Sequence, residues 1–516
     1  MTISLTGVSE RPGSAEALTS LLSARFASRL FAKDATLWGE AAAAEAAVRL
    51  GWTDATGAAL DLIDGAERLA SEYRAAGIDR IVLCGMGGSS LAPLVIAPAL
   101  SVLDSTHPDA VRAALEGDLQ RTAVVVSSKS GGTVETLSHL AAWEGAFAGA
   151  GIDAAERIVV VTDPGSTLAE RAAASGMRAF LADPTVGGRF SALTAFGIVP
   201  SVLAGADFRP IIAEAAAVRH DLSADSGENP ALALAAALHA DLPERFVLEL
   251  HPDGSLPAEL GLWIEQLVAE STGKQGHGLL PVALPVGAAG TRSTAALSLG
   301  FGLSSPAGAD ARPAGELFVS APLGAQLLLW QVVTAALGFL LGVDPFNQPD
   351  VEAAKIATRA SLGGAAAPVA SPPAASDLLA ELRRVAPADG YLAIQAYVDP
   401  TAPEIAEQLE RLRSALGEEL GIAVTAAYGP RYLHSTGQLH KGGPQQGAFL
   451  QLIDVPVRDV VIPGPEAGAE LRFGELMRAQ ARGDASVLRA RGRAVVTVER
   501  EHVEGYLAEL IAGCAR

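Results

Sequence analysis

Short apolar runs alternate with stretches of helical spacing over most of the chain. The runs IVLCG (81–85), AVVVSS (123–128) and RIVVVTD (157–163) are rich in β-branched residues and end in small or polar ones. A second series begins at RFVLEL (245–250) and continues through GLLPVALPV (278–286). Buried parallel strands with helices on both faces of the sheet produce this pattern. The sequence therefore predicts an α/β protein with doubly wound parallel sheets.

The length of the chain requires several domains. Single hydrophobic cores rarely grow past about 250–300 residues, and this chain has 516 residues. The first residues carry helical spacing, and a Pro- and Ala-rich stretch separates a third set of apolar runs. We expect a helical N-terminal arm at 1–55, α/β domains at 56–205 and 206–365, a linker at 366–376 and a smaller C-terminal α/β domain at 377–516.

Charge and cysteine content exclude several classes of protein. The formal charge of −20 repels nucleic acid and anionic membranes, so a site for an anionic ligand must be built locally. The two cysteines, Cys84 and Cys514, are too few and too far apart in sequence for a disulfide framework or a cysteine zinc site. No HxH, HExxH or cysteine cluster supports a metal site.

One segment is apolar enough to raise the question of a membrane. Residues 319–343 contain no charged side chain, and about 20 apolar residues suffice to span a bilayer. The segment also holds Gln326, Gln331 and Pro322 and lacks a flanking basic cluster, so we interpret it as a buried core helix. The N-terminal residues lack the pattern of a signal peptide. We expect a cytoplasmic protein without a membrane partner.

A glycine-rich turn follows the first strand of the predicted sheet. In GMGGSSLAP (85–93), glycines at a strand-to-helix turn let backbone N–H groups approach an anion, and Ser89 and Ser90 can donate hydroxyls. The segment is not a Walker loop, because no Gly-Lys-Ser/Thr follows. Such turns are also common as plain tight turns, so this motif alone leaves both interpretations open.

A second loop concentrates hydrogen-bond donors at a helix start. SSKSGGTVET (127–136) brings together the hydroxyls of Ser128, Ser130 and Thr133 with Lys129. A phosphate monoester, with its three acceptor oxygens, requires such a cradle. A solvated loop is the alternative interpretation. Two such loops at the carboxyl ends of neighbouring strands favour a ligand site, because ligands bind at that edge of open α/β sheets.

Together the two loops resemble the paired sugar-phosphate loops of SIS (sugar isomerase) domains, and in particular those of the phosphoglucose isomerase family. Three later segments are similar to motifs of that family in the same order: VGGRFSALTAFG (186–197), IEQLVAESTGK (264–274) and PFNQPDVEAAK (345–355). The resemblance implies two doubly wound SIS domains. It also implies an aldose–ketose isomerase that acts on a small sugar phosphate, without cofactor or metal, through ring opening and a cis-enediol.

The resemblance also implies roles for individual residues. Glu270 matches the catalytic base, Arg189 the arginine that stabilises the enediolate, and Lys355 the lysine near the ring oxygen. The matching substrate-binding residues are Gly88, Ser89, Ser128, Lys129, Ser130, Thr133, Gln266 and Gln348.

Elementary chemistry is compatible with these roles. Gln266 and Glu270 are four residues apart and lie on one helix face. A carboxylate in a dehydrated cleft has its pKa raised toward the working pH, and Arg189 would oppose that shift while stabilising the enediolate. Without the resemblance, Glu270 would be an ordinary surface glutamate, and Arg189 and Lys355 would be partners in ion pairs.

The acid–base group for ring opening is displaced relative to the family. The family carries its histidine between the glutamate and the lysine, where this chain has only His277. The segment 431–443 (RYLHSTGQLHKGG) instead lies beyond Lys355, and it partly matches the family segment that carries this histidine. It is similar to the isomerase part of transaldolase–isomerase fusion proteins. We favour His434, with His277 as the alternative. In the family the neighbouring subunit donates this histidine, so we expect a homodimer.

Two other functions fit the motifs less well. A non-catalytic SIS regulator would bind a sugar phosphate, but it would have no use for Glu270, Lys355 and Arg189. An isomerase for another sugar phosphate, such as mannose 6-phosphate or an amino-sugar phosphate, would need a different pocket. Thr272, where many relatives carry asparagine, could widen it. We expect interconversion of glucose 6-phosphate and fructose 6-phosphate.

Overall fold

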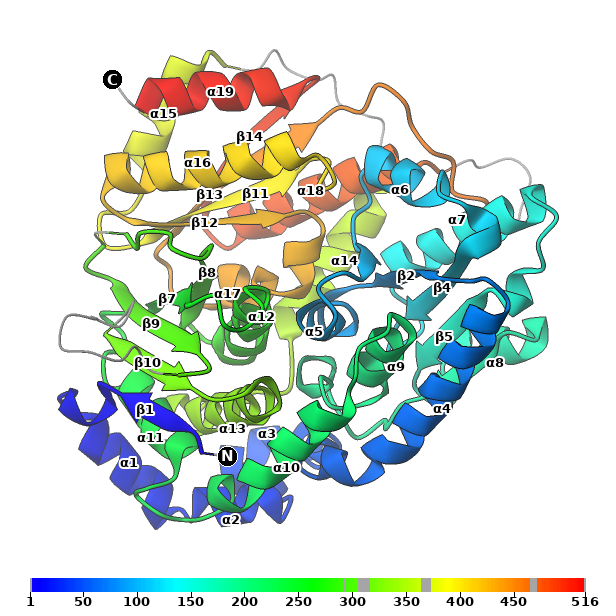
Figure 1. The fold of residues 1–516 in the computed structure, drawn as a ribbon. Coiled ribbons are helices and arrows are strands. Elements are labelled where there is room, and N and C mark those ends of the chain that lie inside the picture. The colour runs from blue at the N-terminus through cyan, green and yellow to red at the C-terminus, as the bar shows by residue number, and fades with distance from the viewer. Residues whose placement is uncertain (1, 292, 305–315, 363–372, 465–470, 515–516) are drawn as a thin grey trace.

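Three sheets, whose strands are parallel apart from one edge strand, meet around one central helix (Figure 1). A computed structural model describes residues 2–291, 293–304, 316–362, 373–464 and 471–514. The central helix is α12 (Leu260–Thr272), which contacts α5 (Leu91–Ile96), β8 (Leu280–Ala283) and α17 (Gly437–Gly442). These contacts join elements that are more than 300 residues apart in sequence. The predicted α/β fold with parallel sheets is confirmed.

The first sheet has the doubly wound form that the apolar runs predict. All its neighbouring strands are parallel. Alternate strand residues pack on opposite faces, because side chains point to the two sides in turn. In spatial order the strands are β3 (Ser101–Leu103), β2 (Arg80–Gly85), β4 (Thr122–Ser127), β5 (Ile158–Thr162) and β6 (Arg178–Leu181). Helices α4 (Ala55–Ala75) and α9 (Ala195–Leu203) cover one face, and α6 (Pro108–Leu115), α7 (Val134–Gly149) and α8 (Thr167–Ser175) cover the other.

The second sheet shares its core with the N-terminal arm. Its edge strand, β1, lies inside the arm predicted to be helical and pairs antiparallel with β10. In spatial order the strands are β1 (Ser4–Thr6), β10 (Leu317–Ser320), β9 (Ala296–Gly302), β7 (Val247–Pro252) and β8. The helices around it are α1 (Ser14–Ser23), α2 (Phe26–Phe31), α3 (Glu40–Ala46), α10 (Arg209–Leu222), α11 (Pro230–His239), α12 and α13 (Leu323–Leu341).

Helix α13 is the apolar segment noted in the sequence. Among the described residues it is the one helix long and apolar enough to cross a membrane, and 83% of its apolar window is buried inside the protein. Its two glutamines bond within the fold, since Gln331 Nε2 donates to Phe190 O at 2.8 Å and Gln326 Nε2 to Val319 O at 3.3 Å. The prediction of a core helix is confirmed.

The third sheet belongs to the C-terminal part of the chain. Its four strands are parallel, in the order β12 (Ala423–Tyr428), β11 (Tyr391–Tyr397), β13 (Gly447–Asp454) and β14 (Ala494–Arg500). Helices α15 (Ala375–Val385), α16 (Pro403–Leu420) and α19 (Val503–Cys514) cover one face, and α18 (Phe473–Ala490) and α14 (Pro349–Leu362) pack together on the opposite side of the sheet. The predicted linker falls mostly on 363–372, outside the described residues, and the proposed domain boundaries stay predictions.

Each sheet with the helices packed on it is called a unit here, and the third unit contacts both the first and the second. Tyr391 and Phe449 share a buried cluster with Phe246 and Leu280 of the second. Toward the first unit, Arg431 forms a bidentate ion pair with Asp104, which follows β3. The Nε–Oδ2 distance is 2.6 Å and the Nη2–Oδ1 distance is 2.8 Å. The Asp104 side chain is 3% exposed, so its charge depends on this partner.

We expect Asp104→Ala to destabilise the protein by about 2–4 kcal/mol, because Arg431, whose side chain is 22% exposed, would stay largely buried without its counter-charge. A lower midpoint of urea-induced unfolding measures this loss. Asp79→Ala is the matched control, since Asp79 pairs with Arg121 where both side chains are more than half exposed. Such exposed pairs contribute roughly 0–1 kcal/mol. Equal midpoints for the two variants would contradict the assignment.

Candidate active site

A cavity of about 630 Å³ opens where the carboxyl ends of β2 and β4 face α12 and the third unit. It gathers segments that are distant in sequence. Its lining includes ten residues predicted from the motifs, namely Gly88, Ser89, Lys129, Ser130, Thr133, Arg189, Gln266, Glu270, Gln348 and His434. It also includes Phe346 and Asn347 of the segment 345–355, which were not predicted as site residues, and Glu45, Arg49 and Asp163, which lie outside the motifs.

The first glycine loop is a packing junction. Gly87 has φ +55°, and a Cβ there would lie 2.6 Å from His434 O and 2.7 Å from Gln266 Nε2. A Cβ on Gly88 would lie 2.1 Å from Gly188 O. Only glycine fits at these two positions, since each backbone touches another segment of the site. The loop therefore brings the neighbouring motifs together at the cavity.

The second loop forms the start of α7 and offers its donors to the cavity. Ser128 Oγ and Thr133 Oγ1 lie 3.0 Å apart, and the Gly132 N–H donates to Ser130 Oγ at 3.3 Å. Thr133 is the residue before the helix, and its side chain does not cap the first turn, so the free N–H groups remain available. Ser128 is buried behind the loop and does not line the cavity.

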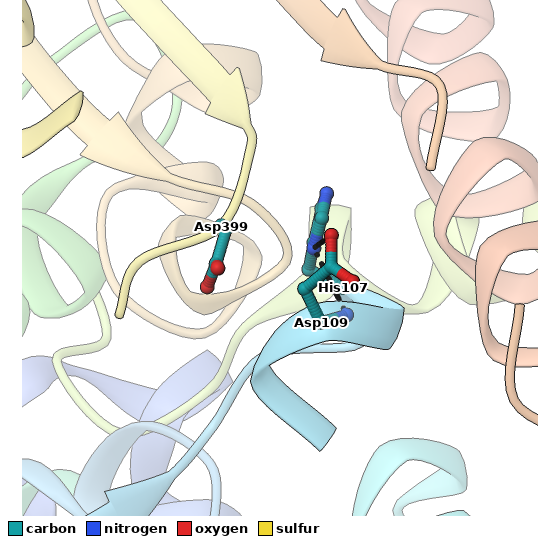
Figure 2. A group of neighbouring side chains, drawn as sticks. All are labelled: His107, Asp109 and Asp399. Carbon is teal, nitrogen blue, oxygen red and sulfur yellow. Dashed lines mark hydrogen bonds and ion pairs between the residues drawn. The ribbon is translucent and has the colours of Figure 1, made fainter. Parts of the chain in front are cut away.

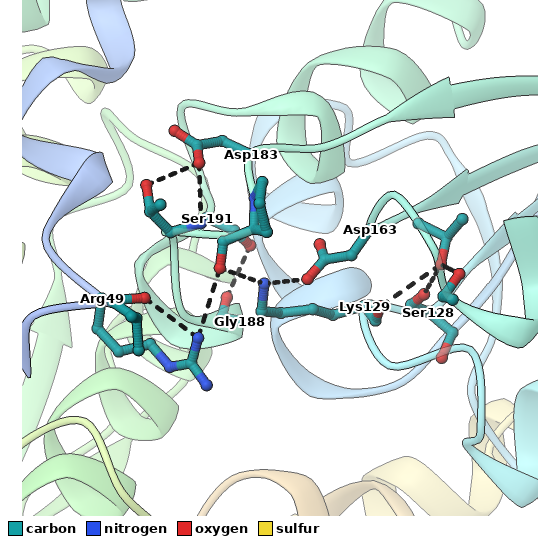
Figure 3. A network of polar contacts seen from close by, with 12 residues as sticks. Arg49, Ser128, Lys129, Asp163, Asp183, Gly188 and Ser191 are labelled. Atoms are coloured by element: carbon teal, nitrogen blue, oxygen red, sulfur yellow. Dashed lines mark hydrogen bonds and ion pairs between the residues drawn. The ribbon is translucent and has the colours of Figure 1, made fainter. Parts of the chain in front are cut away.

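Lys129 extends away from this loop into a network of polar contacts (Figure 3). Its ammonium forms an ion pair with Asp163 and donates to Pro184 O at 3.2 Å. Burial raises the pKa of the Asp163 carboxyl above its usual value, and Lys129 opposes that rise. The lysine is therefore held in place before any ligand arrives.

Glu270 and Arg189 face each other in the buried part of the cavity. Arg189 Nη1 lies 3.9 Å from Glu270 Oε1, and the two side chains are 7% and 6% exposed. The other terminal nitrogen, Nη2, donates to Phe346 O at 2.6 Å and to Asn347 O at 3.2 Å. Burial lowers the pKa of Arg189, and the charge of Glu270 opposes that shift. The guanidinium is fixed by one edge and directs the other at the carboxylate.

Four buried polar atoms of this lining have no hydrogen-bond partner. Arg189 Nη1 is a donor, and the other three are acceptors, namely Gln266 Oε1, Asn347 Oδ1 and Asp163 Oδ1. The amide nitrogen of Gln266 is used, since it donates to His434 O at 2.8 Å and to Glu270 Oε2 at 3.3 Å. Buried polar groups rarely stay unpaired, so a donor and an acceptor left open in one cavity point to a hydroxyl-bearing ligand.

His434 reaches the cavity from the third unit of the same chain. It ends a short helical turn at 431–434, and its Nε2 lies 3.0 Å from Glu135 Oε1. Gln480 Nε2 donates to the same oxygen at 2.7 Å. Burial pushes the pKa of Glu135 up, but the charge and hydrogen bond of His434 outweigh it, and the pKa lies below its usual value. The alternative, His277, is exposed and does not line the cavity.

The expectations for Lys355 and Thr272 are not confirmed by the structure. The side chain of Lys355, within α14, lies outside the described residues, so its role stays a prediction. Thr272 does not line the cavity, and the expectation that it widens the pocket is wrong. Its Oγ1 donates to Val268 O at 2.8 Å and accepts from the Leu279 N–H at 3.1 Å. The Thr272 hydroxyl therefore serves as hydrogen-bond partner to two backbone groups at the end of α12.

One group of side chains has the composition of a metal site (Figure 2). Ligand atoms of His107, Asp109 and Asp399 lie within 4.8 Å of one another. Both ring nitrogens of His107 already have partners, because Nδ1 accepts from the Asp109 N–H at 3.3 Å and Nε2 contacts Asp454 at 3.3 Å. The Asp109 carboxylate already forms an ion pair with Arg112. We assign no metal to this group.

Comparisons with known proteins agree with the motifs. No family model matches the chain. A probable glucose-6-phosphate isomerase of Haloarcula marismortui is 34% identical over 212 residues, which are 39% of this chain and 49% of the relative. A glucose-6-phosphate isomerase of Rubrobacter xylanophilus is 34% identical over 255 residues, 44% and 57% of the two chains. The chain thus spans about half the length of these curated relatives.

A solved structure shares the fold. The glucose-6-phosphate isomerase of Chlamydia trachomatis superposes with a TM-score of 0.53 at 20% identity, over 67% of this chain and 85% of that one. The resemblance to phosphoglucose isomerases that the motifs indicated is therefore confirmed by sequence relatives of that name and by a common α/β architecture.

Next to Gln266, a second carboxyl of α12 is buried without a direct counter-charge. Glu265 is 6% exposed. Burial raises its pKa to about 8, although a backbone hydrogen bond at Ala283 and the charge of Arg431 pull the pKa down. At neutral pH the folded chain therefore holds a proton on Glu265 that the unfolded chain has released.

This proton makes stability depend on pH with a definite sign. Between the ordinary pKa of 4.5 and about 8, the free energy of unfolding falls as pH rises, because only the folded state binds the proton. We expect Glu265→Gln to remove that slope. The free energy of unfolding of the variant, relative to that of the wild type, should therefore rise by roughly 3 kcal/mol from about pH 5 to about pH 8. Urea unfolding at each pH measures the difference. Parallel curves for the two proteins would contradict the burial of an ionisable proton here.

Proposed function

We propose that this chain interconverts glucose 6-phosphate and fructose 6-phosphate through ring opening and a cis-enediolate. The observation that carries the proposal is the placement of Glu270 against Arg189 in a cavity that also holds a donor-rich loop. The names of the curated relatives support the same substrate pair. The pathway is the one that uses these hexose phosphates in glycolysis and gluconeogenesis.

The loop at 128–133 would hold the phosphate. Its hydroxyls, the free N–H groups at the start of α7 and Lys129 supply several donors to an anion with three acceptor oxygens. The phosphate fixes one end of the sugar, so the opposite end reaches the buried part of the cavity. Binding energy from this remote group then positions the reacting carbons.

Glu270 would carry the proton between the two carbons. It removes the proton from C2 of the open-chain aldose, which leaves an enediolate with the charge on O1, and returns it at C1. The hydroxyl proton of O2 passes to O1 in the same interconversion, so that the carbonyl moves from C1 to C2. The free Nη1 of Arg189 would donate to the oxygen on which negative charge develops, an interaction stronger in the transition state than in the bound sugar. Gln266 Oε1 would accept from a sugar hydroxyl.

His434 would open the ring, with Lys355 near the ring oxygen as the family resemblance implies. The buried carboxylate of Glu135 holds the imidazole and offsets its charge when protonated. Gln480 fixes Glu135 in turn. The pair joins an acid–base group of the third unit to the phosphate-loop helix of the first.

Three further expectations concern the oligomeric state, the cellular location and the choice of hexose phosphate. The homodimer is an expectation from the family resemblance, and the family's histidine from a neighbouring subunit was a second reason for it. Here His434 of the same chain lies at the cavity, so the second reason no longer applies, and the dimer stays a prediction from the resemblance. A cytoplasmic location follows from the proposed metabolic role. An isomerase for mannose 6-phosphate stays the alternative, and a coupled assay with both hexose phosphates separates the two.

We expect Glu270→Gln to fold normally and to lose about 10³-fold in kcat, because the amide cannot accept the proton. A coupled assay for glucose 6-phosphate formation measures the loss. Glu259→Gln, just before the start of α12 and outside the cavity lining, is the matched control and should keep its activity. Near-normal turnover of the Glu270 variant would exclude the mechanism.

Ring opening can be tested apart from proton transfer. Opening and closing the ring exchanges the α and β anomers of glucose 6-phosphate, and this exchange does not need Glu270. We therefore expect Glu270→Gln to keep the anomer exchange, and Glu270→Gln/His434→Ala to lose about 10²-fold of it, within the range for a general acid–base group. Exchange spectroscopy by NMR measures both rates. Equal exchange in the two variants would show that His434 does not open the ring.

A further inference from the structure

The N-terminal arm reaches the cavity at Arg49, a residue outside every motif. The arm is fastened there, because Leu50 forms a bridge with Val186 and the Gly51 N–H donates to Thr185 O at 3.0 Å. A Cβ on Gly51 would lie 2.1 Å from Thr185 Oγ1, so the contact is tight. The segment that the arm grips is the one that carries Arg189.

The guanidinium of Arg49 lies beside the ammonium of Lys129 (Figure 3). Arg49 Nη1 donates to Pro184 O at 3.4 Å, and Lys129 Nζ donates to the same oxygen at 3.2 Å. Both side chains line the cavity. Two cations that share one carbonyl acceptor repel each other, so the arrangement requires negative charge nearby.

In the free protein, carboxylates supply that charge. Glu45 Oε1 accepts from Arg49 Nε at 2.8 Å, and Asp163 pairs with Lys129. The Arg49 and Glu45 side chains keep 27% and 36% exposure, so their pair is accessible and weakly held. An anion with several oxygens that enters the cavity can take the place of Glu45 on the planar fork of the arginine.

We propose that Arg49 binds the phosphate of the substrate together with Lys129, and that Glu45 holds the guanidinium until the phosphate arrives. This inference rests on the proposed function for the identity of the ligand. The net charge of −20 gives it a physical reason, since the chain as a whole repels a dianion and must build positive charge at the site. The arm is then part of the binding site.

Calorimetry with inorganic phosphate and with fructose 6-phosphate tests the assignment without turnover. We expect Arg49→Ala to raise the dissociation constant of each about 10- to 100-fold, the range for a hydrogen bond between charged groups. Arg49→Lys, which keeps a point charge without the fork, should fall between. In the isomerase assay KM should rise with kcat nearly unchanged, because the contact is equal in ground and transition states.

Glu45→Gln separates a binding role from a structural one. If Arg49 binds phosphate, removing the competing carboxylate leaves the dissociation constant unchanged or lowers it, opposite to Arg49→Ala. If the pair only fastens the arm, both variants weaken binding alike. Arg25→Ala, on an exposed side chain of the same arm, is the control and should match the wild type.

An unchanged phosphate affinity in Arg49→Ala, or an equal loss in Glu45→Gln, would overturn the proposal. Tight binding of fructose 6-phosphate without isomerisation by the wild type would instead contradict the proposed function. In that case the effect of Arg49→Ala on phosphate binding would still decide the role of Arg49.

Discussion

The hydrogen bond from Gln266 to the backbone carbonyl of His434 joins the three units at the cavity. It runs from the central helix to the loop of the third unit, and both atoms press against Gly87 of the first. Because no side chain fits at Gly87, the three backbones approach closely, and Glu270 one turn along α12 takes its position from the same contact. The geometry of the reacting groups therefore depends on how the units dock.

The cavity is less acidic than the chain as a whole. The protein carries a formal charge of −20, whereas the lining balances the cations Arg49, Lys129 and Arg189 against the carboxylates Glu45, Asp163 and Glu270. Lys129 and Arg189 are held by carbonyl oxygens or by a carboxylate, so their positions are set before a ligand binds. Preorganised donors of this kind need no rearrangement when charge develops on a ligand.

The third unit is best understood through the loop at 431–434. Arg431 pairs with Asp104, and Tyr432 Oη donates to the buried Asp484 at 2.7 Å. His434 then meets Glu135 of α7. The loop is thus anchored to the first unit at two points and to its own unit at a third. The third unit thereby places the imidazole of His434 at the cavity that the motifs of the other two units form.

The sequence alone indicated the central strands of the sheets, the glycine turns and nine motif residues around the cavity, because strand patterning and ligand loops are local in sequence. It also identified His434, but only as one of two alternatives. Arg49 and Glu45 came from the tertiary structure, since nothing in their own neighbourhoods marks them. Glu135 lies inside the second loop motif, but only the structure shows its contact with His434. Their positions depend on contacts between segments more than 100 residues apart, such as Leu50 with Val186 and His434 with Glu135. Such contacts are decided by packing between units, which no local pattern records.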